Sequence, residues 1–259
     1  MKILVEAESH VLSIGINRPE KRNAFDLEMI EQLAAAYQRL ADDPELRVGL
    51  LYAQGEHFSA GLDLAEVGPV VGTRGPKVLA GSGRYDPFGV WGEQVPKPVV
   101  VALQGISFTL SIELALASEI AIASEDARFR QLEVGRGILP FGGATFRAPT
   151  KLGWGNAMRF LLTAEEFGAQ EAYRIGLVQE VVPKGKQLDR AREIARLIAA
   201  QAPLGVQGTL ANARLMRREA ERLAAEHLTS LLPKIFTSSD AAEGVASFLE
   251  RREGRFTGK

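Results

Sequence analysis

The sequence predicts an α/β fold, with a parallel sheet in the first half of the chain and helices in the second. Short apolar runs at 48–53 (VGLLYA) and 99–103 (VVVAL) are typical of buried parallel strands, and they alternate with segments of helical spacing. After residue 144 the pattern is mainly helical, and the segments 187–202 and 205–228 are alanine-rich and amphipathic.

Apolar periodicity and the residues at segment ends define the individual elements. Two strands meet at Glu8 and Ser9, and a turn-rich loop follows at 17–23. The first helix begins after Asp26, a favourable N-cap, and ends before Pro44. The segments expected to be strands are 2–7, 10–16, 48–53, 99–103, 120–123, 128–132 and 177–182. The segments expected to be helices are 26–41, 107–118, 187–202, 205–228 and 239–252.

Residues 68–98 form the least regular part of the sequence, since glycine and proline recur throughout. Long loops within a compact domain are usually functional or disordered. We therefore expect a mobile flap here.

Composition excludes several classes of function. The chain has 259 residues, is 46% hydrophobic and 24% charged, and has a net charge of −1, which gives no general attraction for nucleic acid or anionic membranes. It contains no cysteine, so disulfides, thiolate metal sites and a cysteine nucleophile are excluded. Three scattered histidines, His10, His57 and His227, argue against a histidine-rich metal site.

The N-terminus has no signal-peptide pattern, because Glu6, Glu8 and His10 interrupt its apolar run. The stretch 99–118 is almost long enough to cross a membrane, but its polar residues favour a buried strand followed by a buried helix. We expect a soluble, cytoplasmic protein.

Two strand-to-loop turns are the first candidate for chemistry, since nucleophile-elbow, Walker A and dinucleotide-binding signatures are absent. Residues 58–63 (FSAGLD) follow one apolar strand, and 105–111 (GISFTLS) follow the next and open a helix. Unpaired N–H groups at two such turns would form an oxyanion hole if they pointed at one atom, and a single donor is worth about 3–4 kcal/mol of barrier. Two ordinary tight turns are the alternative, and spacing alone favours them.

Glu113 is the second candidate, as the only charged residue between residues 99 and 118. It is either a structural carboxylate with satisfied hydrogen bonds or a general acid/base whose pKa burial raises. Glu133 precedes the glycine-rich loop 135–143 and is a plausible partner, although by itself it is typical of a surface charge.

Together these segments resemble the crotonase (enoyl-CoA hydratase/isomerase) superfamily over essentially the whole chain. The matching stretches are 17–19 (NRP), 23–24 (NA), 58–63 (FSAGLD), 97–98 (KP), Gly105, 113–115 (ELA), 127–129 (ARF), Glu133, 137–140 (GILP), 142–143 (GG), Ala169, Ala172, 176–178 (GLV) and 256–258 (FTG). No single short motif carries the resemblance; the ordered spacing does.

The resemblance implies a crotonase-like spiral of ββα turns with a C-terminal helical trimerisation region. We expect residues 1–200 to form the spiral core, with the acyl-CoA site, and 201–259 to form the oligomerisation region of a homotrimer or homohexamer. It implies an acyl-CoA thioester as the small-molecule substrate, with no nucleic acid or membrane partner. It implies no metal site and no cofactor beyond the CoA of the substrate.

The resemblance also assigns roles to particular residues. The oxyanion donors are the backbone N–H groups of Leu62 and Leu110, and the acid/base pair is Glu113 and Glu133. The residues implied in substrate and CoA binding are Lys21, Arg22, Ala24, Ala60, Asp63, Leu64 and, from a neighbouring subunit, Phe256 and Lys259.

Some positions depart from the family pattern. The second turn is usually glycine-rich, whereas here it is Thr109, Leu110 and Ser111, and a side chain at 110 narrows the space beside a thioester. The family often has Gly and Pro near the second glutamate, where this chain has Arg130 and Leu132. Ala65 stands where the family often has a lysine that binds CoA. Phe141 stands where dienoyl-CoA isomerases have an acidic residue, which argues against that activity.

Three functions follow in order of preference. The first is reversible hydration of a trans-2-enoyl-CoA by Glu113 and Glu133. The second is a Δ3,Δ2-enoyl-CoA isomerase, in which one glutamate moves the proton. The third is a homologue that binds acyl-CoA without turnover, to which the unusual turn 109–111 points.

Overall fold

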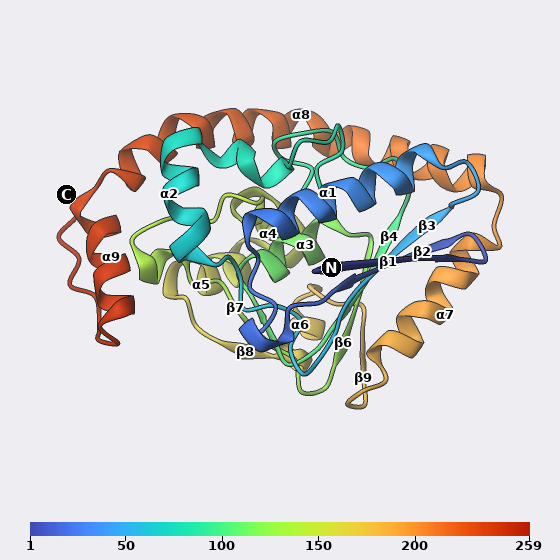
Figure 1. Cartoon of the computed structure of the whole chain (residues 1–259), viewed down its shortest axis with the longest axis horizontal. Helices are drawn as coiled ribbons and strands as arrows, with labels where there is room; N and C mark the ends of the chain where they lie inside the picture. Colours follow the sequence, from blue (N-terminus) through green and yellow to red (C-terminus); the bar gives the residue numbers. More distant parts are fainter.

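The computed structural model describes residues 1–217 and 219–259, and its centre is a six-stranded sheet (Figure 1). The strand order is β1 (Ile3–Glu8), β2 (Val11–Ile16), β3 (Val48–Ala53), β4 (Val99–Leu103), β6 (Ile120–Ser124) and β9 (Glu180–Val182). Within this sheet β1 and β2 pair antiparallel, with Ile3 opposite Ile16, and the other neighbours are parallel. A second, three-stranded sheet contains β5 (Ile106–Phe108), β7 (Arg128–Arg130) and β8 (Phe167–Gly168). The predicted α/β class is confirmed.

Helices cover both faces of the main sheet and form the C-terminal third of the chain. They are α1 (Leu27–Asp42), α2 (Leu64–Arg74), α3 (Leu110–Ala117), α4 (Ala144–Leu152), α5 (Trp154–Thr163), α6 (Ala169–Arg174), α7 (Gln187–Ala199), α8 (Pro203–Phe236) and α9 (Ser239–Leu249). Short 3-10 turns accompany them: η1 (Pro19–Lys21), η2 (Pro76–Ala80) and η3 (Glu133–Arg136).

Successive side chains of the strands enter two different cores, because side chains alternate across a strand. On one face Leu50 and Val100 pack against Ala191 and Ala195 of α7, whose small side chains let the helix lie close to the sheet. On the other face Leu51 and its neighbours belong to the larger core, which also contains residues of α1 and α3.

Both ends of α1 are capped by side chains. The Asp26 carboxylate accepts from Met29 N at 2.9 Å, as the sequence predicts for an N-cap. At the other end the buried Lys97 ammonium donates to Leu40 O and Asp43 O at 2.8 and 2.7 Å. These bonds fix the helix against the sheet.

Two sequence-based assignments between residues 68 and 118 are wrong, the strand expected over 177–182 begins only at Glu180, and the helix expected over 205–228 extends from Pro203 to Phe236. The helix predicted over 107–118 begins only at Leu110, because residues 106–108 form β5, paired with β7, and Thr109 has a positive φ of 50°. The segment 68–98 is not irregular throughout, since α2 extends to Arg74 and η2 follows it. Val67 and Val71, one turn apart, bury one face of α2 and so support helix despite Pro69.

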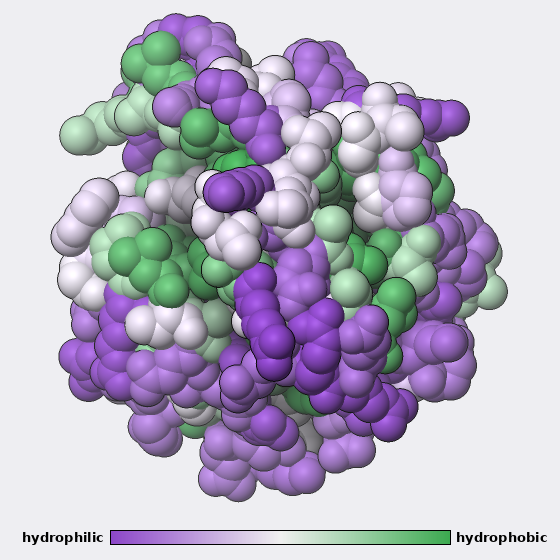
Figure 2. Space-filling model, turned by 90° about the vertical axis from the view of Figure 1, so that its left-hand side faces the viewer, coloured by the Kyte–Doolittle hydropathy of each residue, from purple (hydrophilic) through white to green (hydrophobic). Residues whose placement is uncertain are grey.

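The helix α8 has 34 residues and runs along one side of the molecule towards α9 and the C-terminus (Figure 1). The expected boundary at residue 200 lies between α7 and α8, and the division into two domains stays a prediction. Figure 2 looks onto the end that carries α9 and the C-terminus, where apolar patches interrupt the hydrophilic surface.

Close backbone contacts join α9 to η3, the turn that contains Glu133. A Cβ on Gly244 would overlap the carbonyl oxygen of Arg136, and a Cβ on Gly137 would overlap that of Asp240. The Arg136 guanidinium lies over the Phe248 ring at 4.6 Å. Glycine at 137 and 244 therefore permits this approach, and α9 supports the turn from behind.

Gly244→Ala is expected to lower the free energy of unfolding by about 1–3 kcal/mol, the usual cost of inserting a carbon into a packed contact. Denaturant unfolding measures the loss. Gly208→Ala in α8 is the matched control, because a Cβ there has no neighbour within 4 Å. An equal loss in both variants would show that the α9–η3 contact is not the cause.

Candidate active site

The two predicted donor turns meet at the carboxyl ends of β3 and β4. Ser59 N donates to Ile106 O at 3.1 Å, and Phe108 N donates to Ser59 O at 3.0 Å. Residues 58–63 and 105–111 are therefore held side by side by backbone hydrogen bonds, as a pair of candidate oxyanion turns requires.

The N–H groups of Leu62 and Leu110 both lack an acceptor within residues 1–217 and 219–259. On either side of Leu62, Phe25 N donates to Gly61 O and Asp63 N donates to Phe25 O, both at 2.8 Å. Leu110 is the first residue of α3, where an intrahelical partner does not exist. These are the two N–H groups that the resemblance implies as oxyanion donors.

Glu113 lies one turn into α3 and is only 3% exposed. Its Oε1 accepts from Gly142 N at 2.7 Å and from Ala144 N at 3.2 Å, at the start of α4. A Cβ on residue 142 would overlap this carboxylate, so only glycine allows the approach. Burial raises the pKa of Glu113, while the two backbone hydrogen bonds favour its ionised form.

Glu133 lies on η3 and is 8% exposed, so its interpretation as a surface charge is wrong. Gln131 Nε2 donates to its Oε1 at 3.1 Å, whereas Oε2 has no partner in the described part of the chain. Burial raises the pKa of Glu133, and the nearby negative charge of Glu113 raises it further. The two glutamates thus form one buried electrostatic unit.

Sequence reasoning missed the residues that hold this pair. Gln131 is 2% exposed and two residues from Glu133, but a lone glutamine next to a strand carries no distinguishing signal. The donors to Glu113 are main-chain groups, and only the glycines at 142 and 143 hint at a close approach.

Another buried carboxylate, Asp86, was also missed. It accepts from the N–H groups of Phe88, Val90 and Trp91 at 2.8 Å each, and burial raises its pKa. Its side chain therefore folds the segment 86–91 into a compact loop.

Arg147 of α4 fastens that loop to the rest of the protein. It donates to Phe88 O and to Gly89 O, and pairs with Glu221 of α8 at 3.1 Å. Trp91 Nε1 donates to Phe141 O at 2.9 Å, immediately before the Glu113 donor Gly142. Part of the predicted flap is thus bonded to α4 and to the residues just before it, the segment that contains both donors to Glu113.

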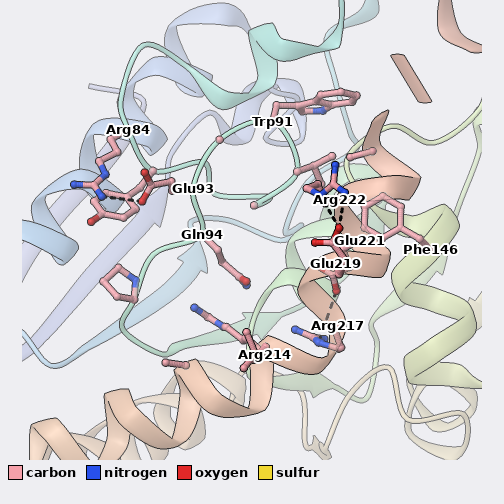
Figure 3. A pocket seen from close by; sticks show the side chains of 18 of the residues that line it. Arg84, Trp91, Glu93, Gln94, Phe146, Arg214, Arg217, Glu219, Glu221 and Arg222 are labelled. Atoms are coloured by element: carbon pink, nitrogen blue, oxygen red, sulfur yellow. Dashed lines mark hydrogen bonds and ion pairs between the residues drawn. The ribbon is translucent and has the colours of Figure 1, made fainter. Parts of the chain in front are cut away.

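A cleft of about 1120 Å³ lies between this loop and α8 (Figure 3). Trp91, Phe146 and Arg214 surround it, with ion pairs such as Arg84–Glu93 at 3.0 Å. Its lining contains none of the four predicted catalytic positions. Val90 and Phe146 are two of its lining residues, and they lie 3.2 and 3.5 Å from where a Cβ of Gly143 would be.

Most of the predicted CoA-binding residues lie together beside the first donor turn. Ala60 N donates to Arg22 O at 2.9 Å, and Arg18 joins Ala24 O to the Asp63 carboxylate at 2.9 and 3.1 Å. Lys21 and Arg22 are exposed next to them, and Leu64 begins α2.

Phe256 and Lys259 are exposed at the other end of the chain, beside α9 (Figure 1). Asp240 holds that end by accepting from Thr257 N and Gly258 N at 2.6 and 2.8 Å. In one chain these two residues are not brought to the Lys21–Ala24 loop.

Within residues 1–217 and 219–259, no three His, Asp or Glu side chains gather as metal ligands. Over the same residues, no helix has the length and apolarity needed to cross a bilayer.

Comparison with known proteins identifies the family to which this α/β fold belongs. A family profile described as enoyl-CoA hydratase/isomerase matches residues 6–259. The enoyl-CoA hydratase EchA19 of Mycobacterium tuberculosis is 33% identical over 98% of this chain and 95% of its own.

Solved structures give the same result. A probable enoyl-CoA hydratase/isomerase from Mycobacterium abscessus has a TM-score of 0.80 and 50% identity, over 100% of this chain and 99% of that one. A carnitinyl-CoA hydratase from Mycobacterium avium has a TM-score of 0.86 and 30% identity with the same coverage. The chain belongs to the enoyl-CoA hydratase/isomerase (crotonase) family, and it is an enzyme of the hydratase, or lyase, type.

Glu133→Gln is expected to stabilise the fold increasingly as pH rises. A carboxyl whose pKa is higher in the folded than in the unfolded state stabilises the fold below its unfolded pKa of about 4.3 and loses that contribution at higher pH. Thermal unfolding of both proteins from pH 4.5 to 8 should therefore show a growing gain in Tm for the variant, at about 2–4 °C per kcal/mol.

Glu165→Gln is the control, because its exposed pairing with Arg159 lowers the pKa of Glu165. Its effect should be small and opposite in sign. A difference between wild type and Glu133→Gln that does not change with pH would contradict the burial of a titrating carboxyl.

Proposed function

We propose that this enzyme adds water reversibly to a trans-2-enoyl-CoA, using Glu113 and Glu133 as an acid/base pair and the N–H groups of Leu62 and Leu110 as an oxyanion hole. The observation that carries the proposal is the asymmetry of the two buried glutamates. Glu113 accepts two backbone hydrogen bonds, which favour its ionised form, and its charge keeps the proton on Glu133. A base and an acid can thus coexist at one pH.

The chemistry divides between these groups. Glu113 takes a proton from water as the water oxygen bonds to the β carbon, and the thioester carbonyl gains enolate charge. The N–H groups of Leu62 and Leu110 stabilise that charge, which is larger in the transition state than in the substrate. Glu133 then delivers a proton to the α carbon, and a proton returns from Glu113 to Glu133 to complete the cycle. The protein's own groups supply every step.

The CoA moiety is proposed to lie along Lys21, Arg22, Ala24, Ala60, Asp63 and Leu64. The support is their common position beside the turn that carries Leu62, with two exposed cations suited to phosphate groups.

Hydration of crotonyl-CoA and longer enoyl-CoAs, and the reverse dehydration of carnitinyl-CoA, are the direct test, with Glu113→Gln and Glu133→Gln beside the wild type. Each substitution should lower kcat by about 10²–10⁴-fold, the usual contribution of general acid–base catalysis. Glu165→Gln should leave kcat unchanged.

Other results of this assay would support the two alternative functions. The enzyme would be a Δ3,Δ2-isomerase if the wild type does not hydrate enoyl-CoA and if isomerisation of a 3-enoyl-CoA survives one of the two substitutions. Calorimetric CoA binding without turnover would make it a binding protein, and no CoA binding would reject all three.

We further propose that the protein assembles as a homotrimer or homohexamer, with Phe256 and Lys259 reaching a neighbouring subunit's CoA. The support is a set of exposed apolar side chains on α8: Leu204, Leu215, Met216 and Leu223 are 85, 64, 91 and 55% exposed. Large apolar patches that stay exposed in a monomer often mark protein–protein interfaces, and an assembly would cover these side chains.

Light scattering after size exclusion should give three or six times the 28.1 kDa mass of the chain. Met216→Glu with Leu223→Glu should reduce that mass, whereas Leu162→Glu on α5 should not. A monomeric wild type would reject the proposal.

A further inference from the structure

The second donor turn has an unusual local conformation. Thr109, immediately before the donor Leu110, has φ 50° and ψ −109°. A β-branched residue in this region is strained, and such strain costs about 1–3 kcal/mol and persists only where surrounding contacts enforce it. Glycine would adopt this conformation without strain. Because residue 109 is threonine, neighbouring contacts must hold the turn.

Ser111 provides such a contact. Its side chain is fully buried, and its hydroxyl donates to the main-chain oxygen of Ser59 at 3.1 Å. This bond runs from the first turn of α3 to the other donor turn, so it joins the two candidate oxyanion donors across the site.

Ser59 also makes hydrogen bonds to the residue just before Leu62. Its hydroxyl accepts from Gly61 N at 3.1 Å and donates to Asn23 O at 2.7 Å, inside a fully buried environment. One residue thus fixes the orientation of the chain just before Leu62 N and receives the Ser111 hydroxyl.

The two turns also touch directly. Gly61 has φ 106°, and a Cβ there would overlap Thr109 Oγ1. Residues 61 and 109 each precede a donor, so a shift of one turn displaces the other.

We propose that Ser111 is a positioning residue for the oxyanion hole. Its hydroxyl sets the separation of Leu62 N and Leu110 N and holds the strained Thr109 turn, without touching substrate. This inference rests on the proposed function, in which those two N–H groups bind the thioester oxygen.

The test compares Ser111→Ala with Ser118→Ala. Ser118 ends the same helix, is 6% exposed, and its hydroxyl donates to Leu114 O at 2.8 Å within that helix. Both variants lose one buried hydroxyl bond, but only the first loses a bond between the turns. Ser111→Ala should lower kcat about 10-fold, less than the 10²–10³-fold for deletion of a donor, with KM little changed. Ser118→Ala should leave kcat unchanged at a similar loss of Tm.

A second readout does not depend on turnover. The infrared carbonyl band of bound butyryl-CoA, labelled with ¹³C at the thioester, should shift to lower frequency in the wild type and in Ser118→Ala, and less in Ser111→Ala. An equal shift and equal kcat in all three proteins would overturn the positioning role. Binding without any shift in the wild type would instead reject the oxyanion hole.

If Ser111→Ala does not fold, Thr109→Gly provides the background. Glycine removes the strain at 109, so Ser111→Ala introduced into Thr109→Gly should cost less stability than in the wild type and still reduce the infrared shift. An unchanged infrared shift in the double variant relative to Thr109→Gly would overturn the proposal.

Discussion

The burial of the Glu113 carboxylate is the constraint on which the rest of the site depends. A carboxylate placed inside an apolar helix is costly unless hydrogen-bond donors come to it. Here the donors are Gly142 N and Ala144 N, so the start of α4 must lie against α3. The same helix α4 carries Arg147, which binds the loop 86–91 and α8. Satisfying one charge thus brings together four parts of the chain.

Glu133 and Glu113 are both buried, but their hydrogen-bond partners differ. Glu113 Oε1 accepts from two N–H groups at the start of another helix, Gly142 N and Ala144 N. Glu133 is contacted by the Gln131 amide and by N–H groups of its own turn, and its Oε2 has no hydrogen-bond partner in the described residues. The peptide donors favour the ionised form of Glu113, and the negative charge of Glu113 raises the pKa of Glu133. Two residues of the same type thus have different electrostatic surroundings.

The sequence predicts the class of fold and the central strands well, because runs such as 48–53 and 99–103 are apolar without interruption and leave few alternatives. It places the helix start at 107 instead of 110, because pairing of Ile106–Phe108 with β7 is a tertiary contact that overrides local helical spacing. It also misses Asp86, Gln131 and Arg147. These residues matter because they are buried next to charged groups or main-chain oxygens of distant segments. Local apolar periodicity does not indicate such tertiary contacts.

The contact between α9 and η3 ties the position of Glu133 to a distant part of the sequence. The turn with Glu133 is backed by Gly244, whose Cα approaches the carbonyl oxygen of Arg136 so closely that a Cβ would overlap it. On the other side of the same contact, Gly137 lies similarly close to the carbonyl oxygen of Asp240. A displacement of α9 would therefore move η3 and the buried Glu133 carboxyl with it, although α9 supplies no hydrogen bond to that carboxyl.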